Sequence, residues 1–495
     1  MTPQGGTEAD QPSDRSTDPL GRYASPLAER YASEEMLALW SPRTRHGLWR
    51  RIWLALAEAE RALGADVPAD AVEAMRAHVD DIDFAAVRRY ERRFRHDVMA
   101  HVHAFADAAP AARRVIHLGA TSADITDNAD LVQMRDALGI LRREIVHVLR
   151  LLARFAHQWR AEPALAYTHL QPAQLTTVGK RATLWMQDLL IDLGDLDHCV
   201  ATLPFRGIKG TTGTQGSYLA LFRGDHARVR ELDRRVTQAM GFDTSQPVTG
   251  QTYSRKTDAR VLAVVAGITA SAAKFSGDIR LLQAFGEMEE PFEEEQVGSS
   301  AMAYKRNPMR AERIAALARF TQSLEPNANQ THSVQYFERT LDDSANRRLV
   351  LPESFLAADA ILLLMANIAG GLEVHPARIR QRIDAELPFM ATEELIVEAV
   401  RAGGDRQAAH ETIRRHSIAA ARALKDGAAR NDLLDRLAAD PDFPADAAAI
   451  RRTLEPSRFI GRAAEQVDEF LDEVVAPILA TREEPMIDAR AGVRV

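Results

Sequence analysis

The stretch that decides the fold is residues 131–159, LVQMRDALGILRREIVHVLRLLARFAHQW, a single uninterrupted amphipathic pattern. Its apolar side chains recur at steps of three and four residues, at Leu131, Met134, Leu138, Leu141, Ile145, Val148, Leu152, Phe155 and Trp159. This spacing continues for about four heptads and places these side chains on one face of an α-helix. Such a helix is stable when its apolar face packs against other helices.

Four further segments have similar apolar seams, at roughly 174–203, 256–285, 308–324 and 345–369. We therefore predict an all-α protein with a central bundle of about five long helices. Long helices with spare apolar faces also favour an oligomer, because those faces need partner subunits.

Shorter helical patterns flank the predicted bundle. On the N-terminal side, Ser41 and Pro42 are typical of a helix start, Gly64 of its end, and a second helical pattern covers 88–108. On the C-terminal side, shorter helices are predicted at 392–402, 406–425 and 461–480. These patterns predict three helical domains after a disordered tail at 1–20: an N-terminal domain at 21–121, the bundle at 122–374 and a C-terminal cap at 375–495.

Composition narrows the classes of function. The 495 residues are 46% hydrophobic and 27% charged, which is typical of a soluble globular protein, and the net charge of −8 argues against a nucleic-acid partner. Cys199 is the single cysteine, so no internal disulfide forms and we predict a reducing, cytoplasmic location. The longest apolar run, 361–372, is too short to span a bilayer, so no membrane partner is predicted.

Two interruptions of the helical pattern contain chemically interesting residues. The stretch 167–174, YTHLQPAQ, breaks at Pro172 and presents His169, although a plain surface histidine explains it as well. The stretch 205–216, FRGIKGTTGTQG, is glycine-rich but lacks the dinucleotide and P-loop patterns, so it predicts no cofactor. Its simpler interpretation is a flexible connection between helices.

Residues 95–103, RHDVMAHVH, invite a metal interpretation, because Asp97 and His101 are four apart and would share one helix face. Metal sites usually show tighter ligand sets, and no other His/Asp cluster points to this segment. A polar helix face is the better explanation, so we predict no metal site.

Residues 298–308, GSSAMAYKRNP, form a loop that leads straight into a helix. The first three residues can expose successive backbone N–H groups, while Asn307 and Pro308 suit the N-cap and the first helical position. A lysine and an arginine precede this helix N-terminus, which itself attracts anions. A Gly-Ser-Ser segment alone is typical of a linker; the whole pattern predicts a mobile strip that binds a negatively charged ligand. An acidic run precedes it, comprising Glu287, Glu289, Glu290, Glu293, Glu294 and Glu295.

This pattern resembles the signature loop of the fumarase/aspartase superfamily, Gly-Ser-Ser-x-Met-Pro-x-Lys-x-Asn-Pro, with Ala303 where the superfamily has proline. Its flanks, 288–292 and 304–310, resemble one family of that superfamily, the adenylosuccinate lyases. The resemblance extends over nearly the whole chain after residue 20, through 22–31, 95–101, 168–174, 249–256, 335–348 and 386–393.

The resemblance implies a β-elimination in purine biosynthesis. It would release fumarate from adenylosuccinate, giving AMP, and from the succinyl-aminoimidazole-carboxamide ribotide, giving the aminoimidazole-carboxamide ribotide. Because a C–H next to a carboxylate is a poor acid, this chemistry needs a base and fixed donors for a dianionic intermediate. By resemblance Ser299 is the base, His169 is the acid that protonates the leaving nitrogen, and Glu312 orients His169.

The resemblance also implies a set of substrate-binding positions. Lys305 and Asn307 are expected to bind a carboxylate. Phosphate, ribose or base would be held by Arg30, Tyr31, Arg95, His96, Asp97, Arg339, Ser344 and Arg348, and the succinyl group would lie near Thr121, Ser122, Gln251 and Arg313. Members of the family are homotetramers whose sites combine loops from three subunits, which implies the same here.

Two other functions stay open at this point. Another lyase of the superfamily would act on argininosuccinate, fumarate or aspartate, which lack a phosphate. A non-catalytic scaffold tetramer is the other alternative, favoured only by Ala303 in the signature and opposed by Ser299, His169, Lys305 and Asn307.

Overall fold

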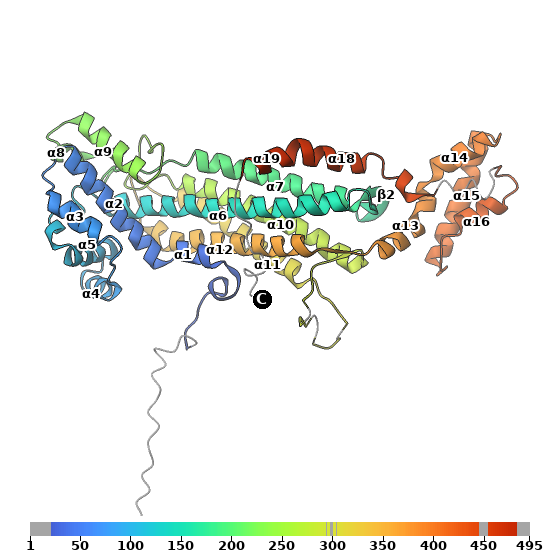
Figure 1. The fold of residues 1–495 in the computed structure, drawn as a ribbon, viewed down its shortest axis with the longest axis horizontal. Coiled ribbons are helices and arrows are strands. Elements are labelled where there is room, and N and C mark those ends of the chain that lie inside the picture. The colour runs from blue at the N-terminus through green and yellow to red at the C-terminus, as the bar shows by residue number, and fades with distance from the viewer. Residues whose placement is uncertain (1–20, 294, 298–299, 303, 445–453, 483–495) are drawn as a thin grey trace, which may run out of the picture.

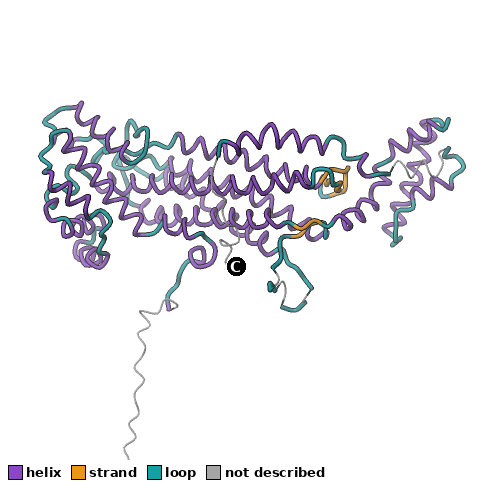
Figure 2. The backbone as a smooth tube through the Cα atoms, in the orientation of Figure 1, coloured by secondary structure: helices purple, strands orange, loops and turns teal. Residues whose placement is uncertain are grey.

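The computed structural model describes residues 21–293, 295–297, 300–302, 304–444 and 454–482. Within them, five long helices lie side by side along the long axis of the molecule (Figures 1 and 2). These are α6 (Ser122–Gln158), α7 (Val178–Ala201), α10 (Lys256–Phe285), α11 (Met309–Ser333) and α12 (Asp342–Gly371). The predicted all-α class and the bundle of five long helices are confirmed.

The seam that predicted α6 forms the centre of the core. Leu131, Leu138, Leu141 and Leu152 have no exposed surface, and only Trp159, just past the helix end, is partly exposed. Burying each leucine contributes about 1.5–3 kcal/mol, so this one face accounts for much of the stability of the bundle.

The N-terminal region packs against one end of the bundle. Its elements are η2 (Leu27–Tyr31), α1 (Glu34–Leu39), α2 (Pro42–Ala62), α3 (Ala69–Ala77), α4 (Phe84–Phe94), α5 (Asp97–Ala108) and η3 (Pro110–Ala112). The start predicted for α2 is confirmed, since the Ser41 side chain accepts a hydrogen bond from Thr44 N at 3.2 Å.

The single helical pattern predicted over 88–108 is wrong in one respect, because the chain forms two helices there. Arg95 adopts a left-handed conformation with φ of 55° and ends α4. His96 then becomes the N-cap of α5, and its Nδ1 accepts a hydrogen bond from Met99 N at 3.3 Å. The break turns the chain at the residues predicted to bind substrate.

The described strands are short and form two antiparallel pairs. β1 (Pro163–Thr168) and β2 (Gln171–Thr177) form an antiparallel hairpin between α6 and α7. β3 (Met288–Glu289) follows α10 and pairs with β4 (Glu373–Val374), which follows α12. Two small helices, α8 (Gly216–Leu221) and α9 (His226–Ala239), complete the connection to α10.

The C-terminal region leaves the bundle through α13 (Pro376–Met390) and then returns to it. α14 (Thr392–Arg401), α15 (Arg406–Lys425) and α16 (Leu433–Ala439) lie at the far end of the molecule and share a core of their own (Figure 1). After η4 (Pro456–Arg458), the helices α18 (Ala463–Phe470), η5 (Leu471–Val475) and α19 (Ala476–Ala480) run back along the bundle beside α7.

Two bundle helices, α10 and α12, are long and apolar enough to cross a membrane by length and composition alone. In α12, 83% of the most apolar window is buried inside the molecule, and Arg347 and Asp359 are buried in the same helix. This burial is the pattern of core helices in a bundle.

Candidate active site

A cleft of about 840 Å³ opens where the N-terminal region meets the starts of α6 and α12. Most of the predicted substrate-binding residues line it, although they come from segments far apart in the sequence. The residues brought together are Arg95, His96, Asp97, Thr121, Ser122, Gln251, Arg339, Ser344 and Arg348.

Asp97 and Arg348 face each other across this cleft, with Arg348 Nη2 donating to Asp97 Oδ2 at 2.6 Å. Burial alone would raise the pKa of the Asp97 carboxyl, but the hydrogen bond from Val98 N and the charge of Arg348 bring that pKa below its ordinary value. Asp97 is therefore ionised at neutral pH and holds Arg348 in the cleft.

The floor of the cleft is a buried ionic network that the sequence analysis did not identify. The Arg255 guanidinium lies 3.1 Å from Asp127 and 2.6 Å from Asp343. Arg347 lies 2.7 Å from Asp258 and 2.9 Å from Asp130. Removing one partner of such a buried pair typically costs about 3–5 kcal/mol, so the network fixes the start of α12 and its binding residues.

A sequence signal for this floor was present. Arg347 precedes Arg348 directly, and neighbouring residues on a helix point in directions about 100° apart. Arg347 can therefore lie in the buried floor of the cleft while Arg348 extends into its open part.

The glycine-rich segment 205–216 is not the flexible connection expected. The buried Asp124 carboxylate accepts hydrogen bonds from Lys209 N and Gly210 N at 2.9 and 3.1 Å and pairs with the Arg206 guanidinium. Gly213 has φ of +81°, and a Cβ there would lie 1.8 Å from Thr249 O. Glycine is required at this position. Thr211 and Thr212 of the segment line a smaller pocket that shares Gln251 and Arg339 with the cleft.

Arg30, Tyr31 and Arg313 form a second group. The Arg313 guanidinium lies 5.6 Å from the centre of the Tyr31 ring, and that of Arg30 lies 6.0 Å from it. Neither Arg30 nor Tyr31 lines the cleft described above, so within one chain these predicted binding residues are separate from it.

His169 occupies the tip of the β1–β2 hairpin. Its φ is 55° and that of Leu170 is 58°, and two consecutive positive values are typical of a two-residue hairpin turn. Both side chains are exposed. The hairpin lies at the opposite end of the bundle from α4 and α5, so His169 is far from the cleft of its own chain (Figure 1).

The signature loop joins α10 to α11. Ser299 and Ala303 lie outside the described residues. Lys305 is exposed, and Asn307 is partly exposed just before α11.

The predicted role of Asn307 as N-cap is wrong, because α11 begins at Met309 with Pro308 in the capping position. The buried carboxylate of Glu290 instead accepts hydrogen bonds from Arg310 N and Ala311 N, each at 3.0 Å. The anion site predicted at this helix N-terminus is thus filled by the chain itself. Glu312 is exposed in the first turn of α11, and no hydrogen bond joins it to His169 among the described residues.

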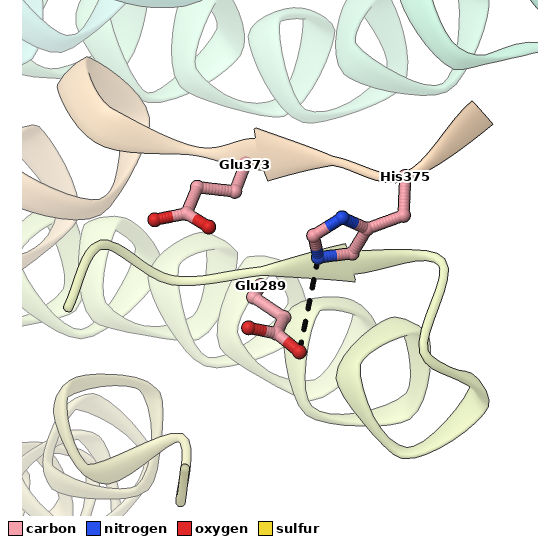
Figure 3. A group of neighbouring side chains, drawn as sticks. All are labelled: Glu289, Glu373 and His375. Atoms are coloured by element: carbon pink, nitrogen blue, oxygen red, sulfur yellow. Dashed lines mark ion pairs between the residues drawn. The ribbon is translucent and has the colours of Figure 1, made fainter. Parts of the chain in front are cut away.

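Glu289, Glu373 and His375 gather where β3 meets β4, with ligand atoms all within 4.8 Å of one another (Figure 3). Arg306 Nη1 lies 3.3 Å from Glu289 and 3.5 Å from Glu373. A guanidinium therefore already supplies the positive charge between these carboxylates. The group anchors the end of the signature loop and gives no reason to propose a metal.

Asp97 and His101 belong to no group of three possible metal ligands among the described residues. The His101 ring is buried, with its centre 3.9 Å from that of His46. Burial lowers the pKa of His101 to about 3. His101 is thus a neutral, buried side chain, although it also lines the cleft beside Asp97. The polar helix face predicted for this segment is therefore wrong at His101.

Comparison with known proteins places these residues in a family. A family model described as Lyase matches residues 32–320, and one described as Adenylosuccinate lyase C-terminus matches 388–470. The chain is 52% identical to the adenylosuccinate lyase of Saccharomyces cerevisiae over 92% of this chain and 95% of that one. It is 49% identical to the enzyme of Schizosaccharomyces pombe over 93% and 96% of the two chains. The chain belongs to the adenylosuccinate lyase family.

Solved structures agree on the fold of this family member. A fumarate lyase from Mesorhizobium sp. BNC1 superposes with a TM-score of 0.75 at 24% identity, covering 92% of this chain and 99% of that one. A β-carboxy-cis,cis-muconate cycloisomerase from Acinetobacter calcoaceticus sp. ADP1 has a TM-score of 0.77 at 22% identity, covering 91% and 100%. The predicted superfamily and family are both confirmed.

Proposed function

We propose that this protein cleaves adenylosuccinate to AMP and fumarate by β-elimination. It also cleaves the succinyl-aminoimidazole-carboxamide ribotide, in purine biosynthesis. The observation that carries this proposal is the 52% identity to a named adenylosuccinate lyase along 92% of the chain. The cleft supports it, because arginines from α4, the 339 segment and α12 converge on one space, as a substrate with a phosphate and two carboxylates requires.

In this proposal Ser299 removes the proton next to a succinyl carboxylate. His169 protonates the leaving nitrogen, with Glu312 as its orienting carboxylate. The dianionic intermediate that forms needs fixed positive charge and donors, which Lys305, Asn307 and Arg313 supply around the succinyl group. Arg339, Ser344 and Arg348 hold the nucleotide part in the cleft.

The active site is shared between subunits of a homotetramer in the cytoplasm. The separation of the candidate groups supports sharing, since the cleft and the His169 hairpin lie at opposite ends of one bundle (Figure 1). A reaction that needs both must take His169 from another chain. Three subunits then contribute the cleft, the hairpin and the signature loop to each site.

A substrate comparison tests the proposal. Purified protein is given adenylosuccinate, argininosuccinate or aspartate, and fumarate release is followed; hydration of fumarate is followed separately. We expect release from adenylosuccinate alone. Turnover of one of the other substrates, with none of adenylosuccinate, would instead indicate a different lyase of the superfamily, and no turnover at all would favour a scaffold.

A further inference from the structure

Directly after α10, the buried side chain of Glu287 connects three elements. Arg382 Nε of α13 lies 2.8 Å from Glu287 Oε1, and the Tyr167 hydroxyl of β1 donates to the same oxygen at 3.1 Å. Arg382 Nη2 also donates to the Tyr167 hydroxyl at 3.0 Å. Each of the three side chains therefore contacts the other two.

Apolar packing shields this node of Glu287, Tyr167 and Arg382. The Tyr167 ring centre lies 5.3 Å from that of Phe285, and the Arg382 guanidinium lies 4.5 Å over the same ring. Glu287 is 1% exposed, and its backbone oxygen accepts a hydrogen bond from His375 N at 2.9 Å. In such a shielded place, removing one partner leaves a costly unpaired group.

A second arginine, Arg181 of α7, faces the node from the bundle side. Burial lowers the pKa of its guanidinium, and the nearby charge of Glu287 partly offsets this effect. Arg181 also donates to Leu165 O in β1, which fixes the beginning of the hairpin to the bundle.

Tyr167 connects the node to His169. Tyr167 pairs with Pro172 across the hairpin, and Thr168 pairs with Gln171, so one residue pair separates the node from the exposed turn. Within the described part of the chain, no side-chain hydrogen bond or ion pair joins residues 168–171 to the bundle, and the turn itself is strained by two positive φ values. The direction in which the turn presents His169 therefore depends on where Tyr167 is held.

We propose that Glu287 and Arg382 are positioning residues for His169 and act through the hydroxyl of Tyr167. The inference rests on the proposed function, in which His169 is the general acid. It also explains part of the acidic run before the signature loop. Glu287 holds the hairpin, Glu289 pairs with Arg306 and Glu290 caps α11, so none of the three is free to face substrate.

The test compares Tyr167→Phe, Glu287→Gln, Arg382→Met and Arg382→Lys with the wild-type tetramer. Tyr167→Phe keeps the ring and removes only the hydroxyl, and the melting temperature measures what the loss of its hydrogen bonds costs the fold. Arg380→Met is the matched control, because Arg380 lies on the same helix, away from the node, and pairs with the exposed Asp384 at 2.7 Å. The measurements are kcat, KM, melting temperature and the solvent deuterium isotope effect on kcat with adenylosuccinate.

A displaced general acid should lower kcat by about 10-fold while KM changes by less than about 3-fold, because misplacement acts on the chemical step. The solvent isotope effect should increase, since proton transfer to the leaving nitrogen becomes slower relative to other steps. Arg382→Lys should have a higher kcat than Arg382→Met, because lysine restores the positive charge, but a lower kcat than the wild type, because it lacks the planar guanidinium with several donors.

Two outcomes separate the claims. The positioning role alone would be overturned if the wild type is active and Tyr167→Phe and Arg382→Met have the same kcat as Arg380→Met. It would also be overturned if these two variants lose kcat while the solvent isotope effect stays unchanged. A wild type that releases no fumarate from adenylosuccinate would overturn the proposed function, and the positioning role with it.

Discussion

Arg347 and Arg348 are consecutive residues of α12 with different environments. Arg347 is 9% exposed and fixed by Asp258 and Asp130, whereas the Arg348 side chain is 57% exposed and reaches across the cleft to Asp97. The first is a structural charge whose loss should destabilise the cleft floor, because it would leave buried carboxylates unpaired. The second is available to a phosphate, because a surface pair is easily exchanged for a ligand.

Arg348→Met should raise KM for adenylosuccinate by about 10-fold or more, since a charge-assisted hydrogen bond to a ligand contributes about 1.5–3 kcal/mol. The fold should be retained. Arg114→Met is the control, because Arg114 pairs with the exposed Asp66 outside the cleft. Steady-state kinetics of both variants check the expectation. An unchanged KM for Arg348→Met would indicate that the phosphate is bound elsewhere.

Glu60 is a buried carboxyl of α2, and neither of its oxygens has a hydrogen-bond partner among the residues that the structure describes. Burial raises its pKa from 4.5 to about 9. The native protein therefore keeps a proton that the unfolded chain loses between these values, and this group makes the protein less stable as pH rises through that window. Glu60→Gln removes this pH-dependent loss of stability, because glutamine does not titrate.

The difference in melting temperature between Glu60→Gln and the wild type should therefore grow in favour of the variant as pH rises from about 5.5 to 8. The growth should correspond to up to about 3 kcal/mol in the free energy of unfolding. Glu58→Gln, at a partly exposed position of the same helix where the side chain pairs with Arg76, should show no such trend. If the melting temperatures of the wild type and Glu60→Gln change with pH in the same way across this range, the raised pKa of Glu60 is contradicted.

At the residue scale, the sequence predicted many of the side chains that line the cleft, but it did not predict which groups form hydrogen bonds with one another. The motif residues from Arg95 to Asp97 and from Arg339 to Arg348 lie together as expected. The cap of α11 was assigned to Asn307 on local preference, but Glu290 provides it. Preferences of the residues next to a helix start cannot identify a capping side chain that precedes the whole loop, as Glu290 does.

At the scale of elements, periodicity predicted the long helices because a heptad seam is a strong signal. It did not predict the β1–β2 hairpin, which is built on Thr168-His169-Leu170-Gln171 without glycine or asparagine in the turn. Tertiary contacts supply what the turn residues lack, notably those of Tyr167. The break at Arg95 was missed for the same reason, since arginine rarely adopts a left-handed conformation.

The signature loop provides the element-scale prediction. Proline at 303, as in the rest of the superfamily, restricts φ and reduces the conformational freedom of the open loop by about 0.4–1 kcal/mol. Ala303→Pro should therefore leave kcat/KM for adenylosuccinate unchanged or increase it by up to about fivefold. Steady-state kinetics of the two proteins side by side measure this. A tenfold loss would show that the backbone takes another path here, which would also question the role of Ser299.

At the scale of the whole molecule, the N-terminal region and the bundle share one hydrophobic core, whereas residues 391–443 have their own. We keep the division at 121 and 374 as a proposal. The arrangement leaves the cleft, the hairpin and the Arg30–Tyr31–Arg313 group apart in one chain. Sequence motifs identify these residues as one candidate set, but they contain no information on which subunit supplies each residue.

Subunit complementation tests this arrangement and the chemistry together. His169→Ala and Ser299→Ala should each lose about 10²-fold or more in kcat, because each lacks one proton-transfer group. Both should still fold and assemble.

The two variants are then mixed in equal amounts, unfolded and refolded together, and assayed for fumarate release from adenylosuccinate. Sites that take His169 from one chain and Ser299 from another regain both groups, so the mixture should recover about a quarter of the wild-type rate. Mixed tetramers that form but remain as inactive as the separate variants would contradict the account.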